Sequence, residues 1–156
     1  MPAVVARTSG DFVKAGEGKV EITQDGGTSW EDVSSFGIAI SSSSTAVEAT
    51  TFKLLDGTSE TVDAGGDPTE TITVTMIFVK QEGSDLHSVL FDTARASDKS
   101  LDIRWSRAGT SGESMFTSTS GKVTSCPPPP FDAASTDVVR VDAVIEAASV
   151  ARSVIA

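Results

Sequence analysis

The single histidine and the single cysteine of this 156-residue chain are the side chains best suited to catalysis. A thiol beside an imidazole base can act as a nucleophile, so His87 and Cys126 would make a dyad if the fold brought them together. However, Cys126 is followed by four prolines, and no recognisable nucleophile motif surrounds either residue. We therefore expect a partly exposed helix histidine, a small buried cysteine and no enzymatic activity.

Four carboxylates in a glycine-rich segment could offer oxygen ligands to calcium: Asp56, Glu60, Asp63 and Asp67. Their spacing does not match the EF-hand loop, and a solvated acidic loop explains them as well. One histidine and one cysteine cannot build a zinc site without carboxylates. The sequence therefore predicts no cofactor.

The two tryptophans, Trp30 and Trp105, could serve as exposed platforms on which sugars stack. Each lies in a strand-like apolar pattern, so packing in the core is the preferred interpretation. The glycine pairs at 26–27 and 65–66 suit turns, and neither opens a helix in a phosphate-binding pattern. We expect no nucleotide site.

Composition limits the classes of protein that remain. Aspartate and glutamate number 22 against 12 lysines and arginines, which gives a formal net charge of −10. A chain this acidic repels a phosphate backbone, so we expect no nucleic-acid binding. The lone cysteine excludes a disulfide-rich scaffold, and no apolar stretch has the length of a membrane span or a signal peptide. We expect one domain, 1–156, which begins with an arm over 1–17.

In the segment 69–80, TETITVTMIFVK, Thr69, Thr71, Thr73 and Thr75 alternate with the apolar residues Ile72, Val74, Met76 and Phe78. That period predicts a half-buried strand, which at ~3.3 Å per residue would span roughly 40 Å. A helix over 83–98, capped by Ser84 or Asp85, would cover its apolar side. The expected core between strand and helix consists of Ile72, Val74, Met76, Phe78, Leu86, Val89 and Leu90.

Other segments alternate in the same way and make the fold class mainly β. Strands are expected over 19–24, 100–106 and 138–147, and residues 114–125 suggest a hairpin around Gly121. The serines at 41–44 suggest a polar break after a returning strand. We expect a β-sandwich or half-barrel with one flanking α-helix.

Two segments contain no such alternation. Residues 53–68 combine glycines and carboxylates with few apolar anchors, which predicts a long loop or extended arm. Residues 126–131, CPPPPF, predict a rigid proline-rich connector rather than a ligand for a proline-binding partner. The arm residues that we expect to contact a neighbouring subunit are Phe52, Leu54, Leu55, Asp56, Gly57, Asp63, Gly65, Gly66 and Asp67.

The order of these elements resembles that of the major tail protein, or tail tube protein, of long-tailed bacteriophages. The stretches that carry the resemblance are GKVEITQDGGTSWEDVSS, AVEATTFKLLDGTSETVDAGGDPTETITVTMIF, SDLHSVLFDTA and DVVRVDAVIEAASV, which together cover most of residues 18–150. The resemblance implies a structural virion protein whose sheet joins those of neighbouring subunits in a hexameric ring. Such rings would stack into a tail tube through which DNA passes without specific binding.

The resemblance also implies where the polar strand face lies and which partners the chain has. The hydroxyl side of a long strand would line a water-filled bore, and the expected lumen-facing residues are Thr71, Thr73, Thr75, Glu21, Arg140, Asp142 and Glu146. Besides its own copies, the implied partners are tape-measure, terminator and baseplate proteins. The implied location is the virion tail, after assembly in the host cytoplasm. The alternative is a β-sandwich binding module on a virion, either a capsid decoration or a carbohydrate-binding domain.

Overall fold

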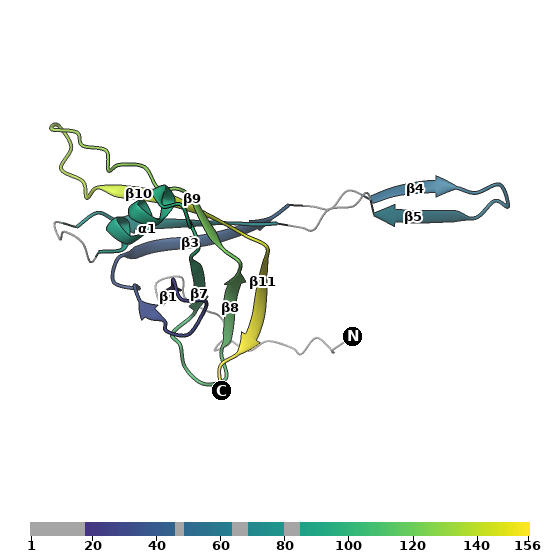
Figure 1. Ribbon diagram of the computed structural model, residues 1–156, viewed down its shortest axis with the longest axis horizontal. Helices are drawn as coiled ribbons and strands as arrows, with labels where there is room; N and C mark the ends of the chain where they lie inside the picture. The colour runs from purple at the N-terminus through teal and green to yellow at the C-terminus, as the bar shows by residue number, and fades with distance from the viewer. Residues whose placement is uncertain (1–17, 46–48, 64–68, 80–84) are drawn as a thin grey trace.

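The computed structural model describes residues 18–45, 49–63, 69–79 and 85–156, so the expected arm over 1–17 lies outside the described residues. In the described residues the chain is mainly β with one helix, which confirms the predicted fold class (Figure 1). The elements are β1 (Lys19–Thr23), β2 (Glu31–Asp32), β3 (Gly37–Ser44), β4 (Ala49–Lys53), β5 (Ser59–Asp63), β6 (Glu70–Ile77), α1 (Leu86–Arg95), β7 (Asp102–Ser106), β8 (Ser114–Thr119), β9 (Lys122–Ser125), β10 (Arg140–Ala147) and β11 (Ser149–Val154).

Strand β6 forms the centre of a four-stranded antiparallel sheet in the order β3-β6-β10-β9. It covers eight residues, fewer than the sequence predicts. The ladder ends there because β3 begins opposite Met76, and β10 begins opposite Ile77. The predicted polar break at 41–44 is instead part of β3, where Ser41 pairs with Thr73 and Ser43 with Thr71.

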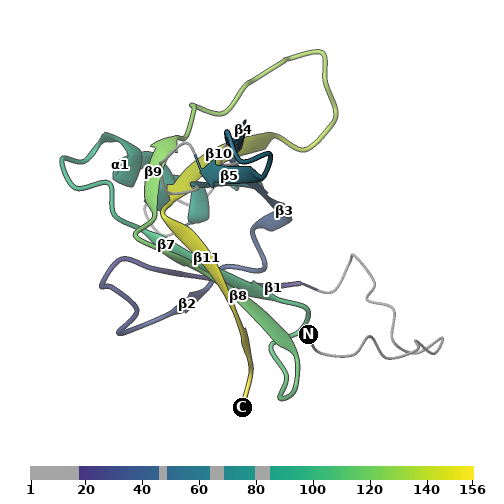
Figure 2. The ribbon, with the colours of Figure 1, turned by 90° about the vertical axis from the view of Figure 1, so that its right-hand side faces the viewer.

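A second antiparallel sheet has the order β11-β8-β7-β1-β2, and its strands cross those of the first sheet steeply in both views (Figures 1 and 2). The predicted hairpin around Gly121 is wrong, because β8 pairs with β7 and β11 whereas β9 pairs with β10. The chain changes sheets at Ser120, which has a φ of 55°. A Cβ on Gly121 would lie 2.3 Å from the carbonyl oxygen of Leu101, so this crossing requires glycine.

The core lies between the two sheets and is closed at one end by α1. The sheet residues Ile72, Val74 and Met76 are almost fully buried, together with the helix residues Leu86 and Leu90. Phe78 and Val89 are partly buried and pack against the same cluster. The apolar side of β6 and the apolar stripe of the helix therefore meet in one hydrophobic cluster.

Strands β4 and β5 form a separate two-stranded sheet that extends away from the body at one end of the molecule (Figure 1). The sequence suggested a long loop or extended arm over 53–68, but residues 59–63 form a strand that pairs with residues 49–53 along its whole length. The cross-strand hydroxyls of Thr51 and Thr61, 2.9 Å apart, add to this pairing. No helix in the described part of the chain is both long and apolar enough to cross a membrane.

Candidate functional site

The outward face of the β3-β6-β10-β9 sheet is built from hydroxyls and carboxylates. Directly opposite residues on antiparallel strands share a face, and the register places Ser41 beside Thr73 and Glu146 beside Thr71. Six of the seven residues that the sequence suggested for a lumen meet on this face: Thr71, Thr73, Thr75, Arg140, Asp142 and Glu146.

Hydrogen bonds connect β6 and β10 across this polar face. The Thr75 hydroxyl donates to Asp142 Oδ1 at 2.5 Å, and the Thr71 hydroxyl lies 3.0 Å from Glu146 Oε2. Lys122 on β9 lies opposite Glu146, which places a cation next to that carboxylate position. The face is therefore polar and hydrogen-bonded, with the carboxylates of Asp142 and Glu146 balanced by the cations of Arg140 and Lys122, and it can present oxygen atoms to water or to a polar cargo.

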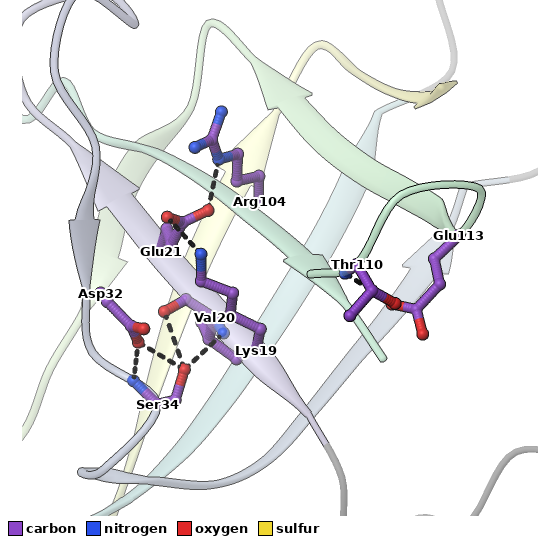
Figure 3. A network of polar contacts seen from close by, with 8 residues as sticks. All are labelled: Lys19, Val20, Glu21, Asp32, Ser34, Arg104, Thr110 and Glu113. Carbon is purple, nitrogen blue, oxygen red and sulfur yellow. Dashed lines mark hydrogen bonds and ion pairs between the residues drawn. The ribbon is translucent and has the colours of Figure 1, made fainter. Parts of the chain in front are cut away.

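The seventh candidate, Glu21, lies on β1 in the other sheet. Its Oε2 accepts a hydrogen bond from Arg104 Nε at 2.7 Å, and its Oε1 lies 3.1 Å from Lys19 Nζ (Figure 3). The hydrogen bond from Arg104 is the largest influence on the carboxylate and lowers the pKa of Glu21. Alternation along β1 gave the correct side of that strand but could not show which sheet the strand enters.

Strand β3 forms an edge of the polar-faced sheet that has no partner strand among the described residues. Eight residues of backbone lie along this edge, from Gly37 to Ser44. The other margin of the sheet is partly covered, because Ser100 bridges to Lys122 and Val123 N donates to Lys99 O at 3.0 Å. The β3 edge is therefore the longer open template for another strand.

The tip of the β4–β5 hairpin, residues 54–58, is a hydrogen-bonded turn that presents apolar side chains. Leu54 N donates to Thr58 O at 2.8 Å, and Asp56 Oδ1 accepts bonds from the Thr58 backbone and hydroxyl. Gly57 has a φ of 86°, which favours glycine at this position. The large exposed apolar side chains of the hairpin are Phe52, Leu54, Leu55 and Val62.

The proline-rich segment continues into a long connection, residues 126–139, which extends well away from the body in Figure 2. This connection and the start of β10 surround a hollow of about 770 Å³, called here the loop hollow. Phe131 and Val138 are its most exposed large apolar residues, and Asp132, Asp137 and Arg140 give it charge.

His87 and Cys126 do not form a nucleophilic pair. His87 Nε2 lies 3.0 Å from the carbonyl oxygen of Pro127, and the histidine ring packs edge-on against Phe78 with centroids 5.2 Å apart. Contrary to expectation, the histidine is buried, because Phe78 and Phe91 enclose it. Burial raises the pKa of the Cys126 thiol to about 11, so the thiol stays protonated at neutral pH.

Among the described residues, the side chains that the sequence suggested for calcium or sugar binding make contacts within the subunit. Asp56 is occupied by the hairpin turn, and no group of three or more potential metal ligands occurs in the part of the chain that is described. Trp30 is half-buried under the Arg104 guanidinium, 4.3 Å from the ring centroid, and Trp105 packs against the core. The arm residues Gly65, Gly66 and Asp67 lie outside the described residues.

Sequence reasoning missed the hairpin strands, the β3 edge and the loop hollow. The Asp56–Gly57 dipeptide between threonine-rich segments is a hairpin signal and could have shown β4 and β5. The serines of β3 carried no such signal, since serine is common in loops. The loop hollow depends on residues that face each other only after β10 has paired, so no local pattern predicts it.

Comparison with solved structures shows that the chain shares its fold with components of contractile injection systems and phage-like tails. A chain of the anti-feeding prophage cap, described as the tube terminating cap, matches at a TM-score of 0.69 and 12% identity, covering 98% of this chain and 96% of that chain. A chain of the sheath-tube complex of the extracellular contractile injection system PVC, in its extended state, matches at a TM-score of 0.67 and 15% identity, covering 96% and 100%.

A third match comes from the tail of the empty gene transfer agent particle, computed with helical refinement in C6 symmetry. Its TM-score is 0.56 at 13% identity, and the alignment covers 97% of this chain and 100% of that chain. No protein-family model and no curated protein sequence matches the chain. The similarity therefore lies in the fold.

Proposed function

We propose that this chain is a structural subunit of a tail tube, which assembles into hexameric rings that stack into a hollow conduit. The observation that carries the proposal is the open edge of β3 beside a sheet face made of hydroxyls and carboxylates. A long open edge leaves backbone groups unpaired in a monomer, and pairing with the next copy satisfies them. The fold shared with tail and tube-associated proteins, one of them from a tail computed with C6 symmetry, supports this assembly.

In the proposed ring, the β3 edge of one copy pairs with backbone of the next copy, so that the sheets form one closed barrel. The polar face of each sheet then lines the bore, and the apolar face stays under the helix and the second sheet. Thr73, Asp142 and Glu146 would contact the water in that bore. This orientation buries no charge and leaves the core of each subunit unchanged.

The charge of the chain suits a conduit. The formal net charge is −10, although on the proposed lining Asp142 and Glu146 are balanced by Arg140 and Lys122. The negative charge of the whole subunit disfavours binding of a phosphate backbone, so DNA can slide through without binding. The subunit would be a non-enzymatic part of a virion tail, assembled in the host cytoplasm and in contact with tape-measure, terminator and baseplate proteins.

A second candidate is a tube terminator that forms one ring and closes a tube made of another protein. The shared fold with a tube terminating cap favours it. The two candidates differ in whether rings of this chain stack on each other. Electron microscopy of the concentrated purified protein tests this directly, because tubes support the first candidate and single rings support the second. A monomer at every concentration and salt condition would overturn both and favour a binding module.

The β3 edge can be tested without disturbing the fold. Thr45 N donates to Thr69 O at 2.9 Å, so alternate amides along β3 point to β6 and the amide of Ser42 points outward. The S42P variant removes only that outward donor, and we expect a folded monomer that no longer forms rings. The control V154P removes an outward amide from the edge strand β11 and should leave assembly intact. Normal rings from S42P would contradict the proposed edge.

A further inference from the structure

The proline-rich connector, residues 126–131, is held to the body at both of its ends. At its start, Arg95 on α1 donates a hydrogen bond from Nη1 to the carbonyl oxygen of Cys126 at 3.2 Å. At its end, the ring of Phe131 packs edge-on against Phe78, with ring centroids 5.9 Å apart. A segment that is fixed in this way loses little conformational freedom when another surface binds it.

Between these two anchors the connector presents proline rings to solvent. Pro127, Pro128 and Pro130 are exposed, and Phe131 is 75% exposed. Consecutive prolines favour the extended polyproline II conformation, because each ring fixes its own φ and restricts the residue before it. Proteins recognise such segments with aromatic side chains that line the binding surface. The exposed side of the connector therefore suits a partner that offers aromatic rings.

The second sheet of this chain carries a pair of such rings. Across β1, β7, β8 and β11, the register places Val20, Trp105, Phe116 and Arg152 in one row. Val20 is 8% exposed and belongs to the core, so this row lies on the core-facing side of the sheet. Trp105 and Phe116 stack with ring centroids 5.8 Å apart and are called here the aromatic platform. Phe116 is nevertheless 36% exposed, so the first sheet leaves this end of the row uncovered.

The connector and the aromatic platform of one subunit cannot meet each other. Figures 1 and 2 show the long connection on one side of the molecule, whereas β8 and β11 extend away from it toward the other side. The hydrogen bond from Arg95 keeps the connector beside α1. Only another copy can therefore bring its platform to the connector, and such a contact between two different patches can repeat from copy to copy.

The charges beside the two surfaces have opposite signs. The loop hollow, at the Phe131 end of the connector, carries the carboxylates of Asp132 and Asp137 and one guanidinium, which leaves one net negative charge. Arg152 lies directly opposite Phe116 and adds a positive charge to the platform. Charges of opposite sign at the edge of a contact guide its orientation, while the apolar rings supply most of the affinity.

We infer that the proline-rich connector of one copy packs on the aromatic platform of a neighbouring copy. This inference rests on the proposed function, because it assumes that copies of this chain assemble. It makes the connector a ligand as well as a link between β9 and β10. It also assigns to the assembly a contact that is separate from the β3 edge and that covers the open end of the core-facing row.

Cross-linking between two single-cysteine variants tests this contact. P130C and R152C are mixed in equal amounts, assembled and treated with a short bis-maleimide linker, and the linked peptides are identified by mass spectrometry. The native Cys126 is buried and should not react in folded subunits. The matched control replaces R152C with S153C, which is also exposed on β11. We expect at least about tenfold more linked dimers from the first mixture, because neighbouring strand residues point to opposite faces of the sheet.

A second pair of variants measures what the contact contributes to assembly. P128S and P130S together change exposed rings, so the monomer should fold normally, but the lowest concentration that gives assembly should rise roughly tenfold. The control A133S with A134S changes exposed residues of the same connection and should assemble like the unmodified chain.

The outcomes separate this inference from the proposed function. If the unmodified protein assembles but P130C links equally to R152C and S153C, the inference fails and the tube proposal stands. Assembly of the proline variant at the same concentration as its control would also overturn the inference. If the unmodified protein does not assemble at any concentration, the proposed function fails and the inference with it.

Discussion

The hydroxyl of Thr71 lies 3.1 and 3.0 Å from the two carboxylate oxygens of Glu146 and donates to them across β6 and β10. Both residues are half-buried even though they belong to the polar face of the sheet. The outer face of the sheet therefore contributes to the stability of the fold, because its hydrogen bonds join the two central strands.

The first prediction concerns this pair. The T71V variant keeps the shape of the side chain but removes the donor, and we expect the free energy of unfolding to fall by about 1–2 kcal/mol. The control T73V changes a residue that lies opposite Val144 and should change stability by less than about 0.5 kcal/mol. Urea unfolding at neutral pH measures both, and equal losses would contradict a specific role for Thr71.

The second prediction concerns pH and Glu21. The hydrogen bond from Arg104 lowers the pKa of Glu21 below its ordinary value of 4.5, so the ionised carboxylate stabilises the folded state. That contribution is present above pH 4.5 and is lost as the pH falls through the lower pKa of the folded state. E21Q should therefore be less stable than the unmodified chain at pH 7, and the difference should shrink in acid. The exposed residue Glu31 provides the control variant E31Q, which should show a smaller difference.

The third prediction concerns the Cys126 thiol. Because burial raises its pKa to about 11, the thiolate is scarce at pH 8 and a thiol reagent should modify the folded chain at least a hundredfold more slowly than the unfolded chain. The neighbouring Ser125 is exposed, so S125C in a C126A background provides a reactive control. Equal rates for the two folded proteins would mean that the proline-rich segment opens readily.

Local sequence patterns predicted the parts of the fold that depend on one strand at a time. The alternation of Ile72, Val74 and Met76 gave the buried side of β6 because the side-chain period of a strand is fixed by its backbone. The same reasoning gave the polar face of β10. The helix was found from its apolar stripe, although its regular turns cover only Leu86–Arg95.

Local sequence patterns could not predict which distant segments pair with each other. Nothing local shows that β8 and β9 enter different sheets, because that choice depends on the sheet crossing at Gly121. Glu21 was grouped with the residues of β10 for the same reason, since alternation gives a face but not a sheet. Interaction surfaces such as the loop hollow depend on such pairings and are therefore the least predictable from sequence.

The fourth prediction compares two leucines. Leu90 is 1% exposed in the cluster between helix and sheets, so L90A leaves a cavity and should cost about 2–5 kcal/mol. Leu55 is fully exposed at the hairpin tip, so L55A should change the stability of the monomer by less than about 0.5 kcal/mol. Urea unfolding of the monomers measures both values. A large loss in L55A would show that the tip packs within its own subunit.

The fifth prediction tests whether the polar face lines the bore. S41K, S43K and T73K together add three cations to the hydroxyl face of β3 and β6 without changing Asp142 or Glu146. The hydroxyl positions project into solvent in the proposed tube, so we expect rings and tubes to form. The altered bore should bind DNA, and the logarithm of the affinity should fall linearly with the logarithm of the salt concentration.

The matched control places the same charge on the other sheet. T119K, A151K and S153K together change exposed positions of β8 and β11, which would lie outside the bore. DNA bound to tubes of the first variant should resist a nuclease because the wall encloses it, whereas DNA bound to the control should be digested. If DNA is protected only by the control, the two faces are reversed and the β11–β8 sheet lines the bore. A first variant that does not fold would show that the hydroxyl face is packed inside the subunit.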